Sequence, residues 1–331
     1  MKLHELLQGI EVLEQNADPE LELTGVSYDS RSTAPGELFA AISGYATDGH
    51  RFIPAALARG AACVLCEHDM PEHTPWVRVR DARAALAQLG CNWFGHPAEL
   101  LCMIGVTGTN GKTTTITMIG SVLDHAKVPH ELVGNIGNPL SGKIDELNAG
   151  ALAVTEVSSF QLETVHAFTP HIACILNLSP DHLERHYSYE NYIYLKKRIL
   201  KNMRESEYAV LNYDDETVRG FADDQRAKIV WFSLQERVYG AYKNGEEIFF
   251  NDQPVLRLDE MSLGGEHNVQ NALACVAVCK LLGVENEAIR AALTDFKGVR
   301  HRIEFVKTVD GVNFYNDSKG TNTARTEAFS Y

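Results

Sequence analysis

The chain has 331 residues, enough for two or three domains with cores of their own. Its 30 basic and 44 acidic side chains give a formal net charge of -14, which argues against a nucleic-acid or anionic-membrane partner. No apolar run reaches the ~18–20 residues that a membrane span requires, and the charged N-terminus lacks a signal-peptide core. We therefore expect a cytoplasmic protein that binds neither nucleic acid nor membrane and acts as a monomer.

Residues 1–100 have the pattern of a small α/β domain. We expect helices at 4–13, 53–59 and 82–94 and strands at 38–42, 62–66 and 77–79. A polar loop between them contains Ser30 and Arg31, whose hydroxyl and guanidinium groups suit a uracil edge or a phosphate. Serine and aspartate also form self-bonded turns, so the residues alone leave binding and a plain turn equally open.

A strand, a glycine loop and a helix follow one another from about residue 100. This order is typical of a nucleoside triphosphate site, because glycine lets backbone N–H groups face phosphate oxygens at a helix N-terminus. The common spacing is not met, since position 106 is Val rather than Gly. We still predict that Lys112 reaches the terminal phosphates and that the Thr113 hydroxyl binds Mg²⁺. The predicted ATP loop consists of Gly108, Thr109, Asn110, Gly111, Lys112, Thr113 and Thr114.

Residues 101–299 alternate between strand and helix, which predicts a parallel sheet. The expected elements are strands at 151–157, 172–178, 207–211 and 229–232, a hairpin at 243–258 and a helix at 268–282. Polar residues follow several strands, so we expect the site along the carboxyl edge of the sheet. Glu156 stands at such a strand end, where a carboxylate is a natural Mg²⁺ ligand, although a solvated loop carboxylate is the default for a lone glutamate.

The helical pattern at 190–203 places a lysine on an apolar face. At about 100° per residue, Lys196 falls among Tyr192, Leu195 and Ile199. Burying a lone ammonium is costly, so this lysine needs a partner or a changed chemical state. A salt bridge and a carbamate that acts as an anionic metal ligand both meet this requirement, and the pattern does not choose between them.

Two histidines, His182 and His186, follow the strand at 172–178. Their spacing suits zinc on a helix, but no third ligand is evident. We expect His182, next to the strand end, to be functional and His186 to lie at the surface. Asn271 stands near a helix start, where asparagine is often a cap.

Residues 300–331 begin a new pattern, with strands expected at 302–309 and 311–315 around an Asp-Gly turn. Arg302 and Asp317 suit a nucleotide's phosphates and ribose, or pair with each other. About 30 residues cannot form a core of their own, so we expect the sequence to be cut short here.

Several separated motifs agree in order and spacing with one family. In these motifs the chain resembles the Mur ligases, which are the ATP-dependent amide-forming enzymes of peptidoglycan synthesis. Residues 101–322 are similar to the member that adds D-glutamate to UDP-N-acetylmuramoyl-L-alanine, whereas residues 1–100 resemble the member that adds the third residue, diaminopimelate or lysine. The central motifs are Gly-Thr-Asn-Gly-Lys-Thr (108–113), Gly-Asn-Ile-Gly-Asn-Pro (134–139), Glu-Val-Ser-Ser-Phe-Gln-Leu-Glu (156–163), Asn-Leu-Ser-Pro-Asp-His-Leu-Glu-Arg-His (177–186), Gly-Glu-His-Asn-Val-Gln-Asn-Ala (265–272), His-Arg-Ile-Glu (301–304) and Asn-Asp-Ser-Lys-Gly-Thr-Asn (316–322). The N-terminal motifs are Tyr-Asp-Ser-Arg-Ser (28–32), Pro-Gly-Glu-Leu-Phe (35–39) and Asp-Gly-His (48–50).

The resemblance implies three domains: a UDP-substrate domain at 1–100, a central ATP-binding domain at 101–299 and the start of a truncated Rossmann-like domain at 300–331. It implies catalytic roles for Lys112, His182 and Lys196, and two Mg²⁺ ions whose ligands include a carbamylated Lys196. The implied metal ligands are Thr113, Glu156, His182 and Lys196. Further implied ATP contacts are Asn271, Arg302 and Asp317. The implied substrate contacts are Ser30, Arg31, Asn135, Ser158 and Gln161, with Lys319 and Thr321 engaging D-glutamate.

The reaction implied is amide formation through an acyl-phosphate, with ATP, UDP-N-acetylmuramoyl-L-alanine and D-glutamate as substrates. Three alternatives stay open. The acceptor is the third residue instead of D-glutamate, or the activity is folylpolyglutamate synthesis, which the N-terminal likeness disfavours. The third alternative is a truncated or chimeric fragment that binds nucleotide without turnover.

Overall fold

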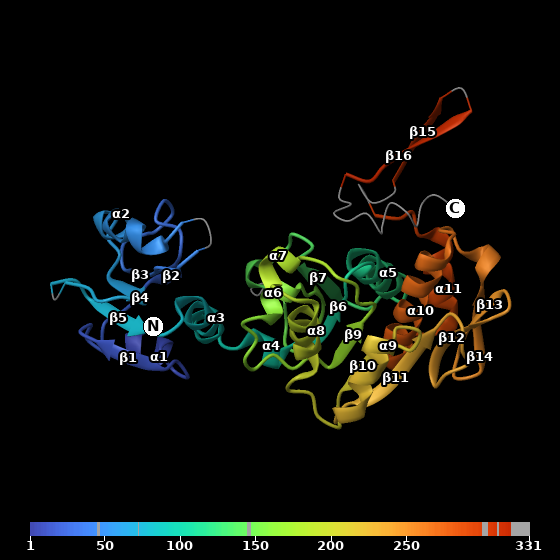
Figure 1. Ribbon diagram of the computed structural model, residues 1–331, viewed down its shortest axis with the longest axis horizontal. Helices are drawn as coiled ribbons and strands as arrows, with labels where there is room; N and C mark the ends of the chain where they lie inside the picture. The colour runs from blue at the N-terminus through green and yellow to red at the C-terminus, as the bar shows by residue number, and fades with distance from the viewer. Residues whose placement is uncertain (45–46, 72, 144–146, 300–303, 310, 319–331) are drawn as a thin grey trace. The chain divides into compact units, whose positions relative to one another are not determined.

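The computed structural model describes residues 1–44, 47–71, 73–143, 147–299, 304–309 and 311–318. The chain divides into two compact units, Met1–Glu99 and Leu100–Tyr331 (Figure 1). Both are mixed α/β units built on largely parallel sheets, as the sequence predicts. Within the described ranges, no helix is long and apolar enough to cross a bilayer.

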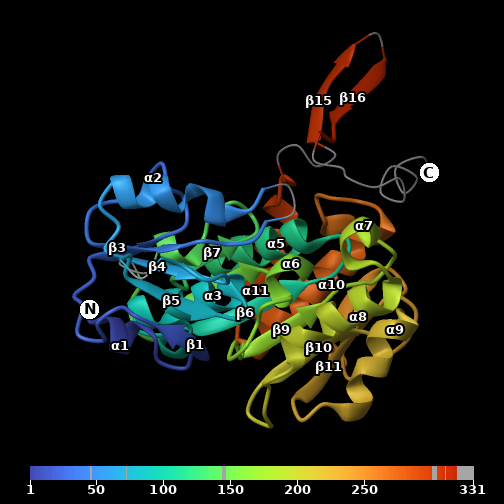
Figure 2. The ribbon, with the colours of Figure 1, turned by 60° about the vertical axis from the view of Figure 1, so that its left-hand side comes forward.

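The first unit contains a five-stranded sheet in the order β1-β5-β4-β3-β2, in which only β1 is antiparallel to its neighbour. Side chains of β4 alternate between two cores, because successive residues of a strand face opposite sides of the sheet. Helices α1 and α3 pack on one face and α2 on the other (Figure 2). The strands are β1 (Val12–Gln15), β2 (Gly25–Ser27), β3 (Glu37–Ala40), β4 (Cys63–Cys66) and β5 (Trp76–Val79). The helices are α1 (Leu3–Leu6), the 3-10 turn η1 (Gly49–Phe52), α2 (Ile53–Ala58) and α3 (Ala82–Trp93).

The expected helix at 4–13 is wrong beyond Leu6. Helix α1 ends there, and Gly9 adopts a positive φ of 74°, which stops a right-handed helix. The chain then enters β1 at Val12 and pairs with β5. A long-range strand pairing therefore overrides the local helical pattern.

Cys63 and Cys66 both lie in β4, where a three-residue separation points their side chains to opposite faces of the sheet. Burial raises the pKa of the Cys63 thiol to about 12 and that of Cys66 to about 11. Such thiols are poor nucleophiles and poor metal ligands. Their spacing therefore reflects a buried strand.

The second unit is organised by a nine-stranded sheet in the order β14-β13-β12-β11-β10-β9-β6-β8-β7. The strands are parallel from β12 to β7, and β13 and β14 add an antiparallel extension. The strands are β6 (Cys102–Thr107), β7 (His130–Gly134), β8 (Leu152–Glu156), β9 (Ile172–Ile175), β10 (Tyr208–Asn212), β11 (Lys228–Ser233), β12 (Gly240–Asn244), β13 (Glu247–Phe250) and β14 (Gln253–Arg257). The hairpin expected at 243–258 is thus a three-stranded extension of the main sheet.

Helices cover both faces of this sheet (Figure 1). In β9, Ile172 and Cys174 join the core under α5 and α10, whereas Ala173 and Ile175 join the core under α8. The helices are α4 (Pro97–Leu100), α5 (Lys112–His125), α6 (Ser159–Leu162), α7 (Leu183–His186), α8 (Tyr189–Lys197), α9 (Glu216–Arg219), α10 (Glu266–Leu281) and α11 (Asn286–Asp295). The 3-10 turns are η2 (Leu140–Gly142), η4 (Arg198–Leu200), η5 (Gly220–Asp224) and η6 (Leu258–Glu260). A separate two-stranded ribbon consists of β15 (Glu304–Val309) and β16 (Val312–Asn316).

The order of the strands creates a switch point at β6. From β6 the chain runs to the sheet edge at β7, returns to β8 beside β6 and then crosses to β9 on the other side of β6. Connections leave in opposite directions there, so the carboxyl ends of β6, β8 and β9 meet at the kind of position where open α/β sheets bind ligands.

A buried amide, Asn92, ties α3 to the N-terminal segment. Its Nδ2 donates to the carbonyl oxygens of Leu6 at 2.7 Å and Gln8 at 2.8 Å. We expect Asn92→Ala to lower the free energy of unfolding by about 2 kcal/mol, because the buried carbonyl of Leu6 and the partly buried carbonyl of Gln8 lose their donor. Urea denaturation measures this loss. Arg83→Ala, at an exposed position of α3, should change the free energy by less than about 0.5 kcal/mol, and equal losses in both variants would contradict the prediction.

Candidate functional site

The glycine loop leads from the end of β6 into α5. Gly111 is the residue before the helix and has a φ of +85°. A Cβ at this position would lie 2.2 Å from Asn271 Oδ1, so only glycine fits against α10. The predicted loop residues and Asn271 thus come together, although they are about 160 residues apart in sequence. Thr115 Oγ1 donates to the same Asn271 oxygen at 3.3 Å.

Lys112 lies at the first turn of α5, and its ammonium is folded back over the loop. Nζ donates to the carbonyl oxygens of Gly108 at 2.9 Å and Thr109 at 2.7 Å. The positive charge is therefore held where the loop backbone N–H groups and the helix N-terminus already favour an anion.

Glu156 ends β8 and is 2% exposed. Its Oε2 accepts a hydrogen bond from Thr113 Oγ1 at 2.7 Å, and its Oε1 accepts one from Asn135 Nδ2 at 3.0 Å. These three predicted site residues follow β6, β7 and β8, so the parallel sheet brings them together at one edge. A buried carboxylate next to a hydroxyl is the hard oxygen donor set that Mg²⁺ prefers.

Lys196 is 2% exposed in α8 and lies over the same loop. Its ammonium donates to Thr107 Oγ1 at 3.1 Å and to the Gly108 carbonyl at 2.8 Å. In the part of the chain that the structure describes, Lys196 forms no ion pair, so the salt-bridge alternative is not realised there. Burial lowers the pKa of Lys196 well below its ordinary value, and the positive charge of Lys112 lowers it further.

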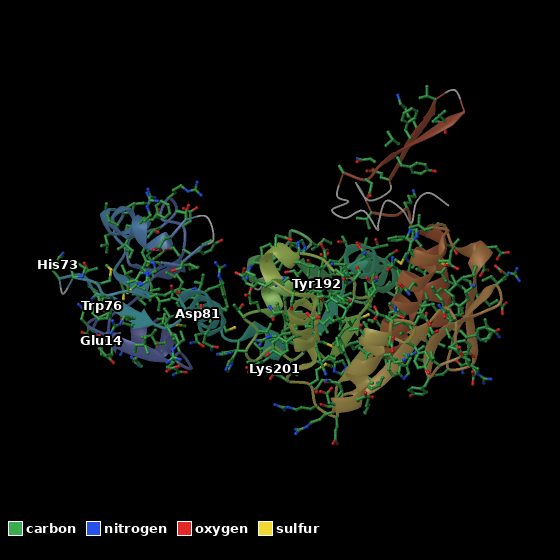
Figure 3. The ribbon with its side chains drawn as sticks, viewed as in Figure 1. Glu14, His73, Trp76, Asp81, Tyr192 and Lys201 are labelled. Atoms are coloured by element: carbon green, nitrogen blue, oxygen red, sulfur yellow. The ribbon has the colours of Figure 1, made fainter. Side chains whose placement is uncertain are left out.

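Two residues that sequence reasoning did not assign to the site hold the loop in place. Asn177, which follows β9, accepts from Asn110 N at 2.9 Å and donates to Asn110 O at 3.2 Å. Tyr192, labelled in Figure 3, lies in α8, and its hydroxyl is 3.0 Å from Thr109 Oγ1. Its ring lies 5.4 Å from Lys196 Nζ. The separation of Tyr192 and Lys196 by four residues was the available signal, because such residues share a helix face.

Ser158 and Gln161, predicted to lie near substrate, contact each other. Ser158 caps α6, and Gln161 Oε1 accepts from Ser158 N at 2.8 Å and from Ser158 Oγ at 2.9 Å. This capping box gives both side chains a local structural role at the end of β8. Thr114 is half-buried on α5 beside Thr113.

His182 is the residue directly before α7 and has a φ of 53°, and its side chain is 38% exposed. Its nitrogens lie 3.8 Å from Asp181 Oδ2 and 3.6 Å from Glu184 Oε1, and its ring contacts the Phe160 ring in a tilted arrangement with 5.1 Å between centroids. Among the described residues, no hydrogen bond joins His182 to Glu156 or Thr113. His182 therefore lies on the loop between β9 and α7 and is not hydrogen-bonded to Glu156 or Thr113 in the described residues.

The expectation that His186 lies at the surface is wrong. His186 is 1% exposed, and its Nε2 lies 3.0 Å from Ser159 Oγ. Burial and the neighbouring positive charge of Arg185 lower the pKa of His186, so its imidazole is neutral at pH 7. A one-turn helix cannot be recognised from periodicity, so the sequence pattern contains no signal for this burial.

The remaining candidates lie elsewhere or outside the described residues. Ser30 is buried and Arg31 exposed on a self-bonded turn of the first unit, in which Arg31 Nη2 lies 2.7 Å from Asp29 Oδ2. That ion pair holds the pKa of Asp29 at about 2. Asp317 follows β16 and is half-buried. Arg302, Lys319 and Thr321 lie outside the described residues.

Two family profiles match the chain. Mur ligase middle domain matches residues 106–279, and Mur ligase family, catalytic domain, matches residues 22–93. UDP-N-acetylmuramoylalanine--D-glutamate ligase of Streptococcus mutans is 47% identical over 225 residues, which are 68% of this chain and 50% of that protein. The chain thus spans about half the length of the curated relatives that it matches.

Solved structures give the same result at the level of the fold. A crystal structure of MurF from Acinetobacter baumannii has a TM-score of 0.74 and 25% identity, covering 99% of this chain and 75% of that one. MurF ligase from Thermotoga maritima, solved in complex with ADP, has a TM-score of 0.66 and 23% identity, covering 93% of this chain and 73% of that one. The family-level resemblance drawn from the motifs is confirmed, and the chain belongs to the Mur ligase family.

Proposed function

We propose that this chain serves an ATP-dependent ligase that joins D-glutamate to UDP-N-acetylmuramoyl-L-alanine in peptidoglycan synthesis. The observation that carries the proposal is its 47% identity over 225 residues to the Streptococcus mutans protein named for that reaction. The geometry supports the ligase class, because a phosphate loop, two lysines and a buried glutamate converge at one sheet edge. In this proposal, residues 1–100 hold the UDP-substrate, 101–299 hold ATP and 300–331 begin a third domain.

In the proposed reaction the substrate carboxylate attacks the γ-phosphate of ATP, giving an acyl-phosphate and ADP. The amine of D-glutamate then attacks the acyl carbon, and phosphate leaves. The loop from Gly108 to Thr114 would hold the triphosphate, and Lys112 would turn from its own loop carbonyls to the terminal phosphate. Thr113 and Glu156, with His182 nearby, would hold Mg²⁺, which when bound neutralises charge on the transferring phosphoryl group.

Lys196 would supply a further metal ligand as a carbamate. Its lowered pKa increases the fraction of free amine at a given pH, and a free amine is the nucleophile that adds to CO₂. The ammonium first releases one proton to solvent, and the amine nitrogen then forms a bond to the carbon of CO₂. A second proton leaves that nitrogen, so the former cation becomes an anion with two oxygen donors. This change removes a buried positive charge that has no carboxylate partner among the described residues.

The remaining contacts are assigned by resemblance. Asn135, Ser158 and Gln161 would face the muramoyl group, and Asn271 and Asp317 would contact ATP, as would Arg302. Ser30 and Arg31 would bind the uridine diphosphate, and Lys319 and Thr321 would engage D-glutamate.

We expect calorimetry to detect binding of Mg·ATP to the chain and a phosphate-release assay to show turnover with UDP-N-acetylmuramoyl-L-alanine and D-glutamate. Lys112→Ala should weaken ATP binding roughly 10–100-fold, because a charge-assisted contact to phosphate is lost. Lys127→Ala, at an exposed position just past the same helix, is the control. Faster release with diaminopimelate or lysine would instead assign the third-residue reaction, and binding without release would show a nucleotide-binding protein without turnover.

Carbamylation of Lys196 is tested by carbon NMR in ¹³C-bicarbonate. We expect a carbamate resonance in the parent protein that is absent from Lys196→Met, because that variant has no amine at position 196. Lys197→Met is the matched control, since the neighbouring Lys197 Nζ lies 2.8 Å from Asp224 Oδ1. A parent protein that turns over at full rate without this resonance would remove the carbamate from the mechanism.

The lowered pKa of Lys196 also predicts a pH dependence of stability in carbonate-free buffer. The unfolded chain binds a proton at Lys196 up to about pH 10.4, whereas the folded chain releases it at lower pH. The free energy of unfolding of the parent should therefore rise with pH relative to Lys196→Met, by up to about 1.4 kcal/mol per pH unit between the folded and unfolded pKa values. Urea denaturation from pH 7 to 10 measures the difference, and a flat difference would contradict the shift.

A further inference from the structure

Helix α7 is a single turn, and unfavourable backbone conformations flank it. His182 before it has a φ of 53°, and Tyr187 after it has a φ of 66°. Residues with a Cβ rarely adopt this region, and they persist there only where surrounding contacts hold them. The contacts that hold α7 therefore also determine where His182 lies.

These contacts come mainly from α6. His186 Nε2 lies 3.0 Å from Ser159 Oγ, and both side chains are buried. The Phe160 ring contacts both histidine rings, with centroids 5.1 Å from His182 and 5.2 Å from His186. An ion pair between Arg185 and Glu163 adds a third link. Helix α7 is thus fixed to the segment that directly follows Glu156.

His186 also connects this pair of helices to the phosphate loop. Its ring lies 5.7 Å from the ring of Tyr192, whose hydroxyl is 3.0 Å from Thr109 Oγ1. A continuous series of contacts thus runs from the loop through Tyr192, His186 and Phe160 to His182.

Packing alone does not explain an imidazole at position 186. Its Nδ1 is buried and has no hydrogen-bond partner within the described ranges. A buried nitrogen without a partner is unfavourable, and phenylalanine would fill similar space without it. The feature that a histidine adds here is the hydrogen bond between its Nε2 and Ser159 Oγ.

We propose that His186 is a positioning residue, which through its hydrogen bond to Ser159 fixes α7 on α6 and so sets the place of the His182 imidazole beside the phosphate loop. The part of the proposal that concerns catalysis rests on the ligase function proposed above. The geometric part, the placement of His182, does not depend on turnover.

Four variants separate the hydrogen bond from the packing. His186→Phe keeps a ring against Phe160 and Tyr192 but loses the bond, and Ser159→Ala removes the partner. His186→Gln keeps an amide N–H that can donate to Ser159. His166→Gln, at an exposed position of the same unit, is the control.

The first readout is the NMR spectrum of the ¹³C-labelled histidine rings of the chain, with the His182 signal assigned from His182→Gln. The Phe160 ring shifts this signal through its ring current, so a displaced His182 is observed directly. We expect the signal to move in His186→Phe and in Ser159→Ala and to return toward its parent position in His186→Gln. The double variant that combines His186→Phe with Ser159→Ala should show no further shift of the His182 signal, because each change breaks the same hydrogen bond.

The second readout separates positioning from folding. We expect His186→Phe to unfold at the same temperature as the parent or higher, to keep its affinity for Mg·ATP within about twofold and to lower kcat roughly tenfold, because a misplaced group slows the reacting step. An unmoved His182 signal in His186→Phe and Ser159→Ala would overturn the proposal, as would a lowered unfolding temperature that accounts for the lost activity. If no variant, the parent included, releases phosphate, the ligase function fails while the NMR result still decides the placement of His182.

Discussion

One backbone carbonyl, that of Gly108, accepts hydrogen bonds from two lysines. Lys112 Nζ lies 2.9 Å from this oxygen and Lys196 Nζ lies 2.8 Å from it. Two ammonium groups on one acceptor are about 6 Å apart or less, and at an effective dielectric constant of 20 their repulsion is about 3 kcal/mol. Lys112 is only half-buried, whereas Lys196 is 2% exposed, so burial and the charge of Lys112 lower the pKa of Lys196. The loop thus holds two positively charged groups that repel each other at one acceptor.

Two changes would reduce the repulsion between Lys112 and Lys196, and both belong to the proposed reaction. An anionic phosphate would draw Lys112 off the carbonyl, and carbamylation would convert Lys196 from a base into an anion. Because both lysines use the same oxygen, each change alters the electrostatic field at the other lysine. In the proposed reaction, nucleotide binding and the state of Lys196 would therefore influence each other electrostatically, with no movement of the sheet required.

The sequence predicts well the features that depend on neighbours along the chain. The phosphate loop is a local pattern, and the burial of Lys196 follows from the 3.6-residue period of one helix. Prediction from the sequence fails where the contact that determines the structure joins residues far apart along the chain. Helix α1 stops early because β1 pairs with β5 more than 60 residues away, and His186 is buried because Ser159 lies 27 residues before it. Gly111 is set against Asn271 in the same way, at a separation that no local window includes. The roles of the site residues stay predictions, because contacts within the protein do not identify a ligand.

The contact between Thr113 and Glu156 illustrates how such a site is prepared. Both Glu156 oxygens accept hydrogen bonds from protein donors, so neither oxygen of this buried side chain lacks a partner. Because the Thr113 proton is directed to Glu156, the lone pairs of its hydroxyl oxygen face away from the carboxylate. A hydroxyl oriented in this way can bind a cation while its proton stays on the glutamate. Glu156 at the end of β8 therefore already orients the Thr113 hydroxyl, which follows β6, so that its lone pairs are available to a cation. Asn135, which follows β7, keeps the carboxylate in place.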